Sequence, residues 1–433
     1  MHPHPPETSS PEPETTQPGP SRFQLRPRCQ RPRTQPPALS LAFSSSSSPS
    51  PPPSPSSSAP SSPSTMASSS SSSSPPSDED VYFSTNPPPR SLEEHTRLAA
   101  SFINTHALAS RRVVLITSGG TTVPLEKQTV RFIDNFSAGT RGATSAEYFL
   151  EAGYAVVFLH RQFSLLPYSR HFSHSKDCFL DFLSPGPTGQ VEWRAGHDAA
   201  KVRDVLAKYR RARDANMLLM IPFVTIGDYL HELRALSRLM RPLGPRGLLY
   251  LAAAVSDFFV PPERMAEHKI QSTDAVVAAV KSEDTDEEFD NFDASPRVPR
   301  SKRLVIDLDP VPKFLKNLVD GWAPQGMIVS YKLETDPALL VRKARYSLDR
   351  YQHHLVIGNL LSTRKWEVVF VSPGRADAWL RVPPPPSSMP AGWGDAEGRP
   401  LRADELPRED PDTEIEKLII PAVAELHDAH IGR

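Results

Sequence analysis

Cysteine is scarce in this chain of 433 residues, and its two cysteines, Cys29 and Cys178, stand far apart. Because Cys29 lies in a segment dominated by Pro and Ser, a stable disulfide between them is not expected. Reduced thiols are typical of intracellular proteins rather than secreted ones. The sequence therefore does not indicate a secreted, disulfide-rich scaffold.

Excess charge and long apolar runs are also missing. Lys and Arg total 49 and Asp and Glu total 50, so the formal net charge is only −1 and nothing favours a nucleic-acid partner. No apolar run reaches the ~18 residues of a membrane-spanning helix, so no membrane partner is expected. No cluster of His, Cys and carboxylates has the spacing of metal ligands, so we expect no metal site formed by the protein alone.

Pro and Ser are abundant, and they are concentrated before residue 90. A segment with so few large apolar residues cannot bury enough surface to offset its ordering entropy. We interpret 1–90 as a disordered low-complexity tail, and we expect a chain that begins near Ser91 to keep full activity. The basic stretch 22–35 resembles a transit peptide in lacking acids, but the abundant Pro opposes a targeting helix. We expect a cytoplasmic protein, with access to the nucleus left open and mitochondrial targeting disfavoured.

After the tail, apolar strand patterns alternate with amphipathic helix patterns. The alternation predicts an α/β fold with a Rossmann-like, mostly parallel sheet and helices on both faces. We expect one domain over 91–433, with inserted loops near 184–197, 273–302 and 373–411. A final helix should be broken or kinked near Pro421. Strands are expected at 113–117, 154–160, 217–223, 248–255, 303–308, 327–333 and 355–359, and helices at 93–109, 141–152, 198–212, 226–240, 310–320 and 337–351.

The most informative segment follows Arg112 and reads VVLITSGGTTVPLEKQTVRFIDNFSAGTRGATSAEYFL. Its apolar strand ends in an SGG turn, and a second turn of small residues at 137–142 begins a helix. Glycine lets the backbone approach an anion closely, and a helix N-terminus offers free N–H groups and a positive dipole end. The two turns therefore suit a phosphate-binding surface, although such a glycine pattern alone is weak. Asn135, just before the second turn, is a candidate for contact with substrate.

This segment resembles eukaryotic phosphopantothenate–cysteine ligases. Four further segments match that family in order and spacing: LYLAAAVSDFFVPPERMAEHKIQS, VPKFLKNLVDGWAP, MIVSYKLETDPALLVRKAR and LVIGNLLSTR. The resemblance implies a ligase of coenzyme A biosynthesis that joins 4′-phosphopantothenate to L-cysteine through an acyl-adenylate, with release of AMP and pyrophosphate. It also implies a homodimer, for which the apolar strands near Met217 and the segment after His160 are candidate contacts.

The resemblance assigns two catalytic roles. Lys269 matches a lysine of the activation step, where an ammonium group would stabilise negative charge on the phosphorus under attack. Asn135 matches an asparagine of the second half-reaction, and its amide would donate to the acyl oxygen of the intermediate. Without the family, Lys269 would be interpreted as a surface lysine and Asn135 as a helix cap.

The resemblance also predicts a nucleotide site. Asp257 follows a strand and could hold a ribose hydroxyl or orient the lysine. Two departures from the family weaken the match: Tyr331 replaces the Phe typical of animal relatives and adds a hydroxyl that needs a partner, and Ala138 replaces a frequent Ser. Without the family, Tyr331 would indicate core packing and Asn359 a turn at a strand end. The matching nucleotide-contacting positions are Gly119, Ser137, Gly139, Gly142, Tyr331 and Asn359.

We expect the nucleotide to be ATP rather than CTP. Bacterial relatives that use CTP carry two lysines before the strand of Asn359, and this chain has Ser347 and Tyr351 there. Mg²⁺ would arrive on the triphosphate, since it prefers phosphate oxygens and water. Nothing resembles the flavin decarboxylase domain fused to many bacterial relatives, so no flavin is expected.

Two other functions are considered. A dinucleotide-dependent oxidoreductase on a Rossmann-like sheet would need GxGxxG after the first strand and an acid after the second, where His160 and Arg161 stand instead. A catalytically inactive scaffold is disfavoured because Asn135 and Lys269 are both present. A turnover assay would separate the scaffold from the ligase.

Overall fold

The computed structural model describes residues 77–173, 179–194, 199–270, 304–385, 389–390, 393 and 398–433. The expected tail up to residue 76 and the expected insert at 273–302 lie outside the described residues. So do parts of the other two expected inserts.

The helices and strands follow closely on one another along the described chain. The helices are α1 (Asp78–Thr85), α2 (Leu92–Leu108), α3 (Thr140–Glu151), α4 (Ala199–Asp214), α5 (Ile226–Leu239), α7 (Phe314–Asn317), α8 (Pro337–Tyr351) and α9 (Glu416–Ile431). The strands are β1 (Val113–Ser118), β2 (Thr122–Pro124), β3 (Phe132–Asp134), β4 (Ala155–Arg161), β5 (Leu183–Pro185), β6 (Val191–Trp193), β7 (Leu218–Phe223), β8 (Gly247–Leu251), β9 (Phe258–Phe259), β10 (Asp309–Pro310), β11 (Met327–Glu334), β12 (Leu355–Leu360), β13 (Glu367–Val371) and β14 (Ala378–Arg381).

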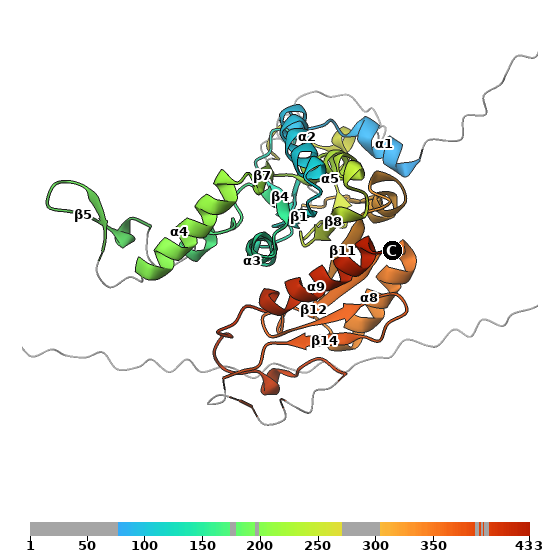
Figure 1. Ribbon diagram of the computed structural model, residues 1–433. Helices are drawn as coiled ribbons and strands as arrows, with labels where there is room; N and C mark the ends of the chain where they lie inside the picture. Colours follow the sequence, from blue (N-terminus) through green and yellow to red (C-terminus); the bar gives the residue numbers. More distant parts are fainter. Residues whose placement is uncertain are drawn as a thin grey trace, which may run out of the picture. The chain divides into compact units, whose positions relative to one another are not determined.

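Eight strands form one sheet in the order β14-β13-β12-β11-β8-β1-β4-β7 (Figure 1). The six strands from β12 to β7 run parallel, and β13 and β14 extend one edge antiparallel. Every residue of β1 is buried, as is typical of a parallel strand covered on both faces. The expected α/β fold with a mostly parallel sheet is confirmed.

Helices cover both faces of the sheet because successive strand side chains point to opposite sides. On one face, Val114 and Ile116 of β1 pack in a core with residues of α3, α4 and α9. On the other, Val113 and Leu115 pack with α1, α2, α5 and α7. Helix α8 packs on β12 and β13 through a third cluster that includes Leu340 and Val356. Within the described residues no helix is long and apolar enough to cross a membrane.

Four expectations about elements are wrong. Residues 304–308 form no strand, because the sheet position beside β8 is taken by β11 and this segment leads instead into the two-stranded ribbon β9–β10. The expected loop at 373–411 contains β14, which pairs with β13. The expected loop at 184–197 contains the hairpin β5–β6. The expected break at Pro421 is absent: helix α9 continues past this residue, which removes only one backbone N–H, while the nearby Ile420 and Val423 are buried.

The tail boundary expected at residue 90 is also too late. Helix α1 begins after Ser77, whose hydroxyl accepts from the Asp80 N–H while the Asp80 carboxylate accepts in return from the Ser77 N–H. This capping box satisfies two N–H groups that a helix start leaves without partners. Tyr82 of α1 is only 3% exposed. The folded part of the chain therefore includes α1, although the Pro- and Ser-rich composition of the surrounding segment had predicted disorder there.

Buried histidines join α9 to the amino-terminal edge of the sheet. His427 is fully buried, with Nδ1 3.0 Å from the Tyr154 hydroxyl and Nε2 2.9 Å from the carbonyl oxygen of Pro245. A neutral ring that donates from Nε2 and accepts at Nδ1 satisfies both contacts. Burial lowers the pKa of His353, His354 and His427 to about 4 each.

We therefore expect acid to destabilise the fold through these rings. Below the unfolded pKa of about 6.5, these histidines bind protons in the unfolded chain but stay neutral in the folded chain. Stability that is present above pH 6.5 is therefore lost as the pH falls toward 4. Each ring should contribute a slope of roughly 1.4 kcal/mol per pH unit in that window. Urea unfolding at pH 7 and pH 5 should show a smaller loss for His427→Gln than for the unsubstituted chain. Equal losses in the two proteins would show that His427 is not responsible.

Candidate functional site

The carboxyl ends of β1 and β8 lie side by side at the point where the strand order of the sheet reverses. From β1 the chain crosses through α3 to β4 on one side, and from β8 it continues to β11 on the other. In open α/β sheets, ligands bind in the crevice at such a switch point. The two glycine turns and the loop that carries Asp257 all lie there.

The turn after β1 depends on two glycines. Gly119 has a φ of +86°, and a Cβ built on it would lie 2.7 Å from Cβ of Arg161. A Cβ on Gly120 would lie 1.6 Å from the carbonyl oxygen of Asn135. The Asn135 N–H also donates to the oxygen of Thr121 over 3.1 Å. Glycine at 120 therefore allows the backbone of Asn135, just after β3, to lie directly against the end of β1.

The second turn forms the start of α3. Gly139, with a φ of +81°, is the N-cap residue, and no side chain caps the first turn from that position. The Ser118 hydroxyl donates to the Gly139 carbonyl over 3.1 Å, and a Cβ on Gly142 would lie 2.4 Å from that hydroxyl oxygen. The Ser137 hydroxyl accepts from the Gly139 N–H over 3.3 Å. Three expected nucleotide positions, Ser137, Gly139 and Gly142, thus meet at a helix start suited to an anion.

A pocket of about 210 Å³ lies beside these turns. It brings together Asn135 and Asp257, which come from opposite sides of the switch point. The Asp257 carboxylate also forms an ion pair with Lys313, with an N–O distance of 3.3 Å. The pocket therefore combines an amide, a hydroxyl and a carboxylate with apolar walls. Its lining consists of Val123, Ile133, Asn135, Ser256, Asp257, Phe258 and Leu308.

Lys269 is exposed and is not among the residues that line this pocket. Its segment lies against the loop after β2, where the Ile270 N–H donates to the Glu126 carboxylate over 3.3 Å. Burial acts to raise the pKa of Glu126, but hydrogen bonds led by those from the Arg131 backbone and guanidinium lower it below its usual value. A charged Glu126 therefore anchors the segment that carries Lys269.

Tyr331 points into the core between the sheet and α3. Its hydroxyl lies 2.5 Å from that of Tyr250, which is 3.0 Å from the Ser145 hydroxyl of α3. Burial raises the pKa of Tyr250 to about 12 and that of Tyr331 well above its ordinary value, so both stay protonated near neutral pH. The extra hydroxyl of Tyr331 thus has the partner it needs. Asn359 is buried in β12, beside Leu333 of β11.

Arg141, within the glycine motif, has a position that the sequence did not reveal. Its guanidinium lies 2.7 Å from the Glu416 carboxylate of α9 and donates to the Arg364 oxygen over 2.6 Å. Its Cζ also lies 5.7 Å from the ring centre of Tyr331. Arg141 therefore ties the start of α3 to the chain after β12. The only sequence signal was an arginine inside a helix-start motif, and such a motif does not predict which distant residues the arginine contacts.

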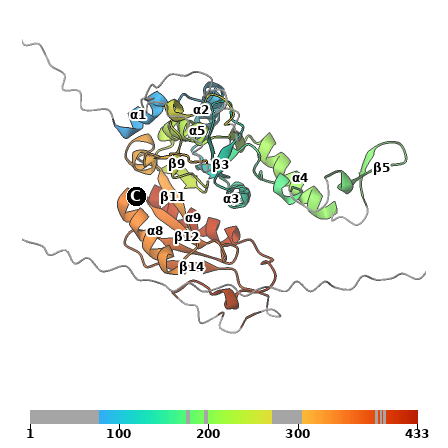
Figure 2. The ribbon, with the colours of Figure 1, turned by 180° about the vertical axis from the view of Figure 1, so that it is seen from behind.

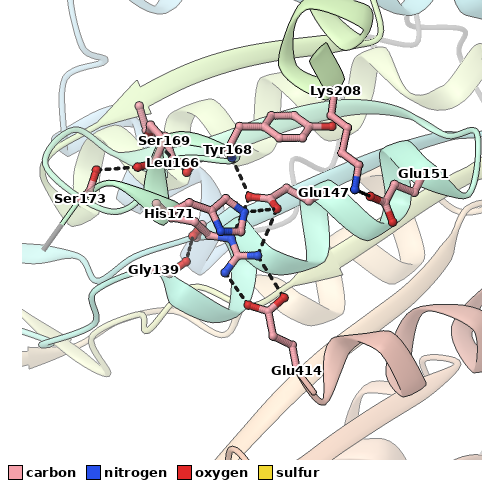
Figure 3. Close-up of polar contacts among 12 residues, drawn as sticks. Gly139, Glu147, Glu151, Leu166, Tyr168, Ser169, His171, Ser173, Lys208 and Glu414 are labelled. Atoms are coloured by element: carbon pink, nitrogen blue, oxygen red, sulfur yellow. Dashed lines mark hydrogen bonds and ion pairs between the residues drawn. The ribbon is translucent and has the colours of Figure 1, made fainter. Parts of the chain in front are cut away.

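A second group of charges anchors the middle of α3 (Figure 3). The Glu147 carboxylate accepts from the Tyr168 N–H, from Arg170 and from His171 at 2.6 to 3.0 Å. Arg170 also pairs with Glu414, which lies just before α9. Burial raises the pKa of Glu147, but bonds from His171 and Arg170 outweigh it and lower the pKa below its usual value. The candidate phosphate helix is thus held by charge at both its start and its middle.

The sheet, the switch point and the glycine turns define an α/β protein of the Rossmann-like class. Over 308 residues the chain is 48% identical to phosphopantothenate–cysteine ligase CAB2 of Saccharomyces cerevisiae, covering 70% of this chain and 80% of that protein. Over 290 residues it is 42% identical to the human phosphopantothenate–cysteine ligase, covering 66% and 84%. The chain therefore belongs to the phosphopantothenate–cysteine ligase family, and it is an enzyme.

A solved structure supports the same assignment. A histidine-to-alanine variant of Cab2, in complex with phosphopantothenate-cysteine, matches this fold with a TM-score of 0.66 and 43% identity, covering 81% of this chain and 98% of that one. No family model matches the chain.

Proposed function

We propose that this enzyme joins 4′-phosphopantothenate to L-cysteine, with ATP consumed to AMP and pyrophosphate through an acyl-adenylate. The observation that carries the proposal is the pocket that unites Asn135 and Asp257 beside the open start of α3. An anion-binding helix start next to a polar pocket suits a reaction between a nucleotide and a carboxylate. The family and the ligand in the solved Cab2 complex support the substrate class.

The roles of the residues follow their positions. The turns at Gly119 and 137–142 would take the nucleotide phosphates, and Asn135 would donate its amide N–H to the acyl oxygen in the adjacent pocket. Asp257 lies in that same pocket and pairs with Lys313, so we propose that it orients a hydroxyl of the bound ligand. Lys269 would stabilise the charge that develops on the α-phosphorus. Tyr331 and Asn359 are proposed to shape the nucleotide site from the neighbouring strands.

Magnesium is proposed as part of the nucleotide substrate. Within the described residues, no group of three or more His, Cys, Asp or Glu could hold a metal. Mg²⁺ keeps several waters and is commonly bound by phosphates with one or two carboxylates. The donors described here therefore fit a cation that arrives on the triphosphate.

Ser347 and Tyr351, the residues that favoured ATP, lie away from the glycine turns of the candidate site. Ser347 and Tyr351 lie in the last turns of α8, next to the start of β12, whereas Asn359 is near the end of that strand. Four residues of β-strand span roughly 13 Å. The two positions therefore lie toward the amino-terminal ends of the strands, whereas the glycine turns lie at the carboxyl-terminal ends. The proposal of ATP rests mainly on the resemblance to eukaryotic ligases.

We expect faster release of AMP and pyrophosphate with ATP than release of CMP and pyrophosphate with CTP. Initial rates with phosphopantothenate and cysteine at matched, sub-saturating nucleotide concentrations measure the preference. Equal or faster turnover with CTP would overturn the choice of nucleotide. Absence of product with both nucleotides would overturn the ligase function itself.

The residues at the end of β4 argue against the oxidoreductase alternative. A dinucleotide enzyme of this class has an acid there to bind ribose. Here Arg161 occupies the position and pairs with Asp134 at 2.8 Å, while His160 is buried and lies 2.8 Å from the Arg161 oxygen. A cationic strand end of this kind does not provide the acceptor that a ribose hydroxyl needs.

We further propose that the enzyme is a homodimer of the cytoplasm. The dimer follows from the family resemblance, and β7, which begins directly after Met217, is an edge strand whose residue Pro222 is exposed. A monomeric mass by light scattering at micromolar concentration, with activity retained, would contradict the dimer. The cytoplasm is proposed from the scarcity of cysteine.

A further inference from the structure

Helix α1 is bound to the folded chain by charge. The Glu79 carboxylate lies 3.1 Å from Arg234 of α5 and accepts from the Trp322 indole N–H over 3.1 Å. It also accepts from the Asn317 amide at the end of α7. The Glu79 side chain is 13% exposed, so these contacts are largely shielded from solvent. One carboxylate thus fixes α1 against two neighbouring helical segments, and Figures 1 and 2 both show α1 close to α5.

Tyr82 is the buried aromatic anchor of the same helix. Its ring lies 5.2 Å from that of Phe259 and 5.3 Å from that of Phe314, both in edge-on geometry. Burial raises the pKa of Tyr82, as expected for a phenol held in an apolar contact. Aromatic pairs at these distances stabilise the packing beyond the burial of their surface.

One of the two rings under Tyr82, that of Phe259, lies directly behind the wall of the candidate pocket. In β9, Phe258 lines the pocket and its neighbour Phe259 contacts Tyr82. This arrangement follows because successive strand residues point to opposite sides. Phe259 pairs with Asp309 of β10, and Leu308 just before it also lines the pocket. The β9–β10 ribbon therefore has the pocket on one face and Tyr82 on the other.

The second ring, that of Phe314, is next in sequence to the ion-pair partner of Asp257. Phe314 directly follows Lys313, whose ammonium pairs with Asp257 at 3.3 Å. The Val311 N–H donates to the Asp257 carbonyl oxygen over 2.9 Å. Tyr82 thus contacts the residues that follow both partners of this ion pair: Phe259, two positions after Asp257, and Phe314, one position after Lys313.

We propose that Tyr82 is a positioning residue for the ligase reaction: it supports the β9–β10 ribbon from behind and sets the places of Asp257 and Phe258 in the pocket. The inference rests on the proposed function for its kinetic consequence only. It implies that α1 belongs to the catalytic unit, contrary to the sequence-based expectation for a chain that begins near Ser91. The start of α3, with its glycine turns, is not in this chain of contacts, so nucleotide binding should depend less on Tyr82.

The test uses three full-length variants: Tyr82→Ala, Tyr82→Phe and, as a matched control on the same helix, Val81→Ala. Val81 is 47% exposed. Tyr82→Ala should raise the KM for phosphopantothenate by about tenfold and that for ATP by no more than about threefold, because the pocket wall and Asp257 move while the phosphate-binding turns stay in place. Tyr82→Phe keeps the ring contacts and should restore the KM for phosphopantothenate, and Val81→Ala should change neither constant.

A merely structural role predicts another pattern. Loss of folded protein lowers the maximal rate but leaves both KM values unchanged, and that result for Tyr82→Ala would overturn the inference. If Tyr82→Ala folds poorly, Tyr82→Leu, which retains apolar volume without the ring, is measured in the same way and judged by the same split.

A readout independent of activity separates this inference from the proposed function. Amide hydrogen exchange at 257–260 and 309–314 should be faster in Tyr82→Ala than in the unsubstituted chain, and Tyr82→Phe should match the latter. Unchanged exchange in an active ligase would refute the role of Tyr82 alone. An unsubstituted chain without turnover would refute the ligase function, while the exchange data would still report on the ribbon.

Discussion

A chain carrying Gly120→Ala should lose about two orders of magnitude in ligase turnover while it remains folded. The added Cβ would lie 1.6 Å from the carbonyl oxygen of Asn135, whereas real Cβ contacts are essentially never shorter than 3.0 Å. The obstacle is backbone, so the segment that carries Asn135, just after β3, must move by more than an ångström. A displacement of that size at a catalytic group typically costs ~10²-fold in rate. Steady-state turnover and a thermal melt on the same sample measure the two effects.

Gly227→Ala is the matched control for this substitution. Gly227 lies in α5, and the nearest atom to its added Cβ is Oγ1 of Thr225 at 3.6 Å, an ordinary contact. Alanine in a helix should leave turnover unchanged and slightly increase stability. If Gly120→Ala retained turnover within a few fold of the unsubstituted chain, the position of Asn135 would not limit the reaction.

Local patterns predicted most of the sheet because each parallel strand is a short apolar run between turn or helix signals. The helix expected at 337–351 coincides with α8, and the strand expected at 355–359 lies within β12. The antiparallel edge strand β14 was missed for a physical reason: its residues are exposed or half-buried, and it pairs only with β13. The apolar residues at 304–308 were mistaken for a strand because a pattern of side chains does not identify a hydrogen-bonding partner.

The candidate site was predictable to the extent that its chemistry is local. The glycine turns and Asn135 follow one another in the sequence, and the structure brings them together at one strand end. Partners from distant segments, such as Lys313 for Asp257, could not be predicted, since no motif joins them. Helix α1 was missed because a composition argument over 1–90 averages a capped, aromatic segment with a long Pro- and Ser-rich one. Lys269 remains a prediction from the resemblance alone.

The two catalytic assignments predict opposite behaviour in a single turnover. Asn135→Asp should still form acyl-adenylate and pyrophosphate and then stall, because the substitution keeps the shape of the side chain but removes the N–H that would donate to the acyl oxygen. The Asn135 backbone should stay in place, since its N–H bond to Thr121 does not involve the side chain. Lys269→Gln should instead fail to form the acyl-adenylate, because it removes the cation proposed to stabilise charge at phosphorus.

The loss of one such electrostatic donor typically costs ~10²–10³ in rate, which rapid-quench analysis can resolve. After one turnover with ATP, phosphopantothenate and cysteine, acyl-adenylate should accumulate in Asn135→Asp and be absent in Lys269→Gln. Lys316→Gln is the control for the loss of a lysine charge, since Lys316 is exposed on α7 and is assigned no catalytic role. It should leave the time course of the intermediate unchanged. Accumulation of the intermediate in Lys269→Gln would show that Lys269 acts after activation, and the two roles would then have to be reassigned.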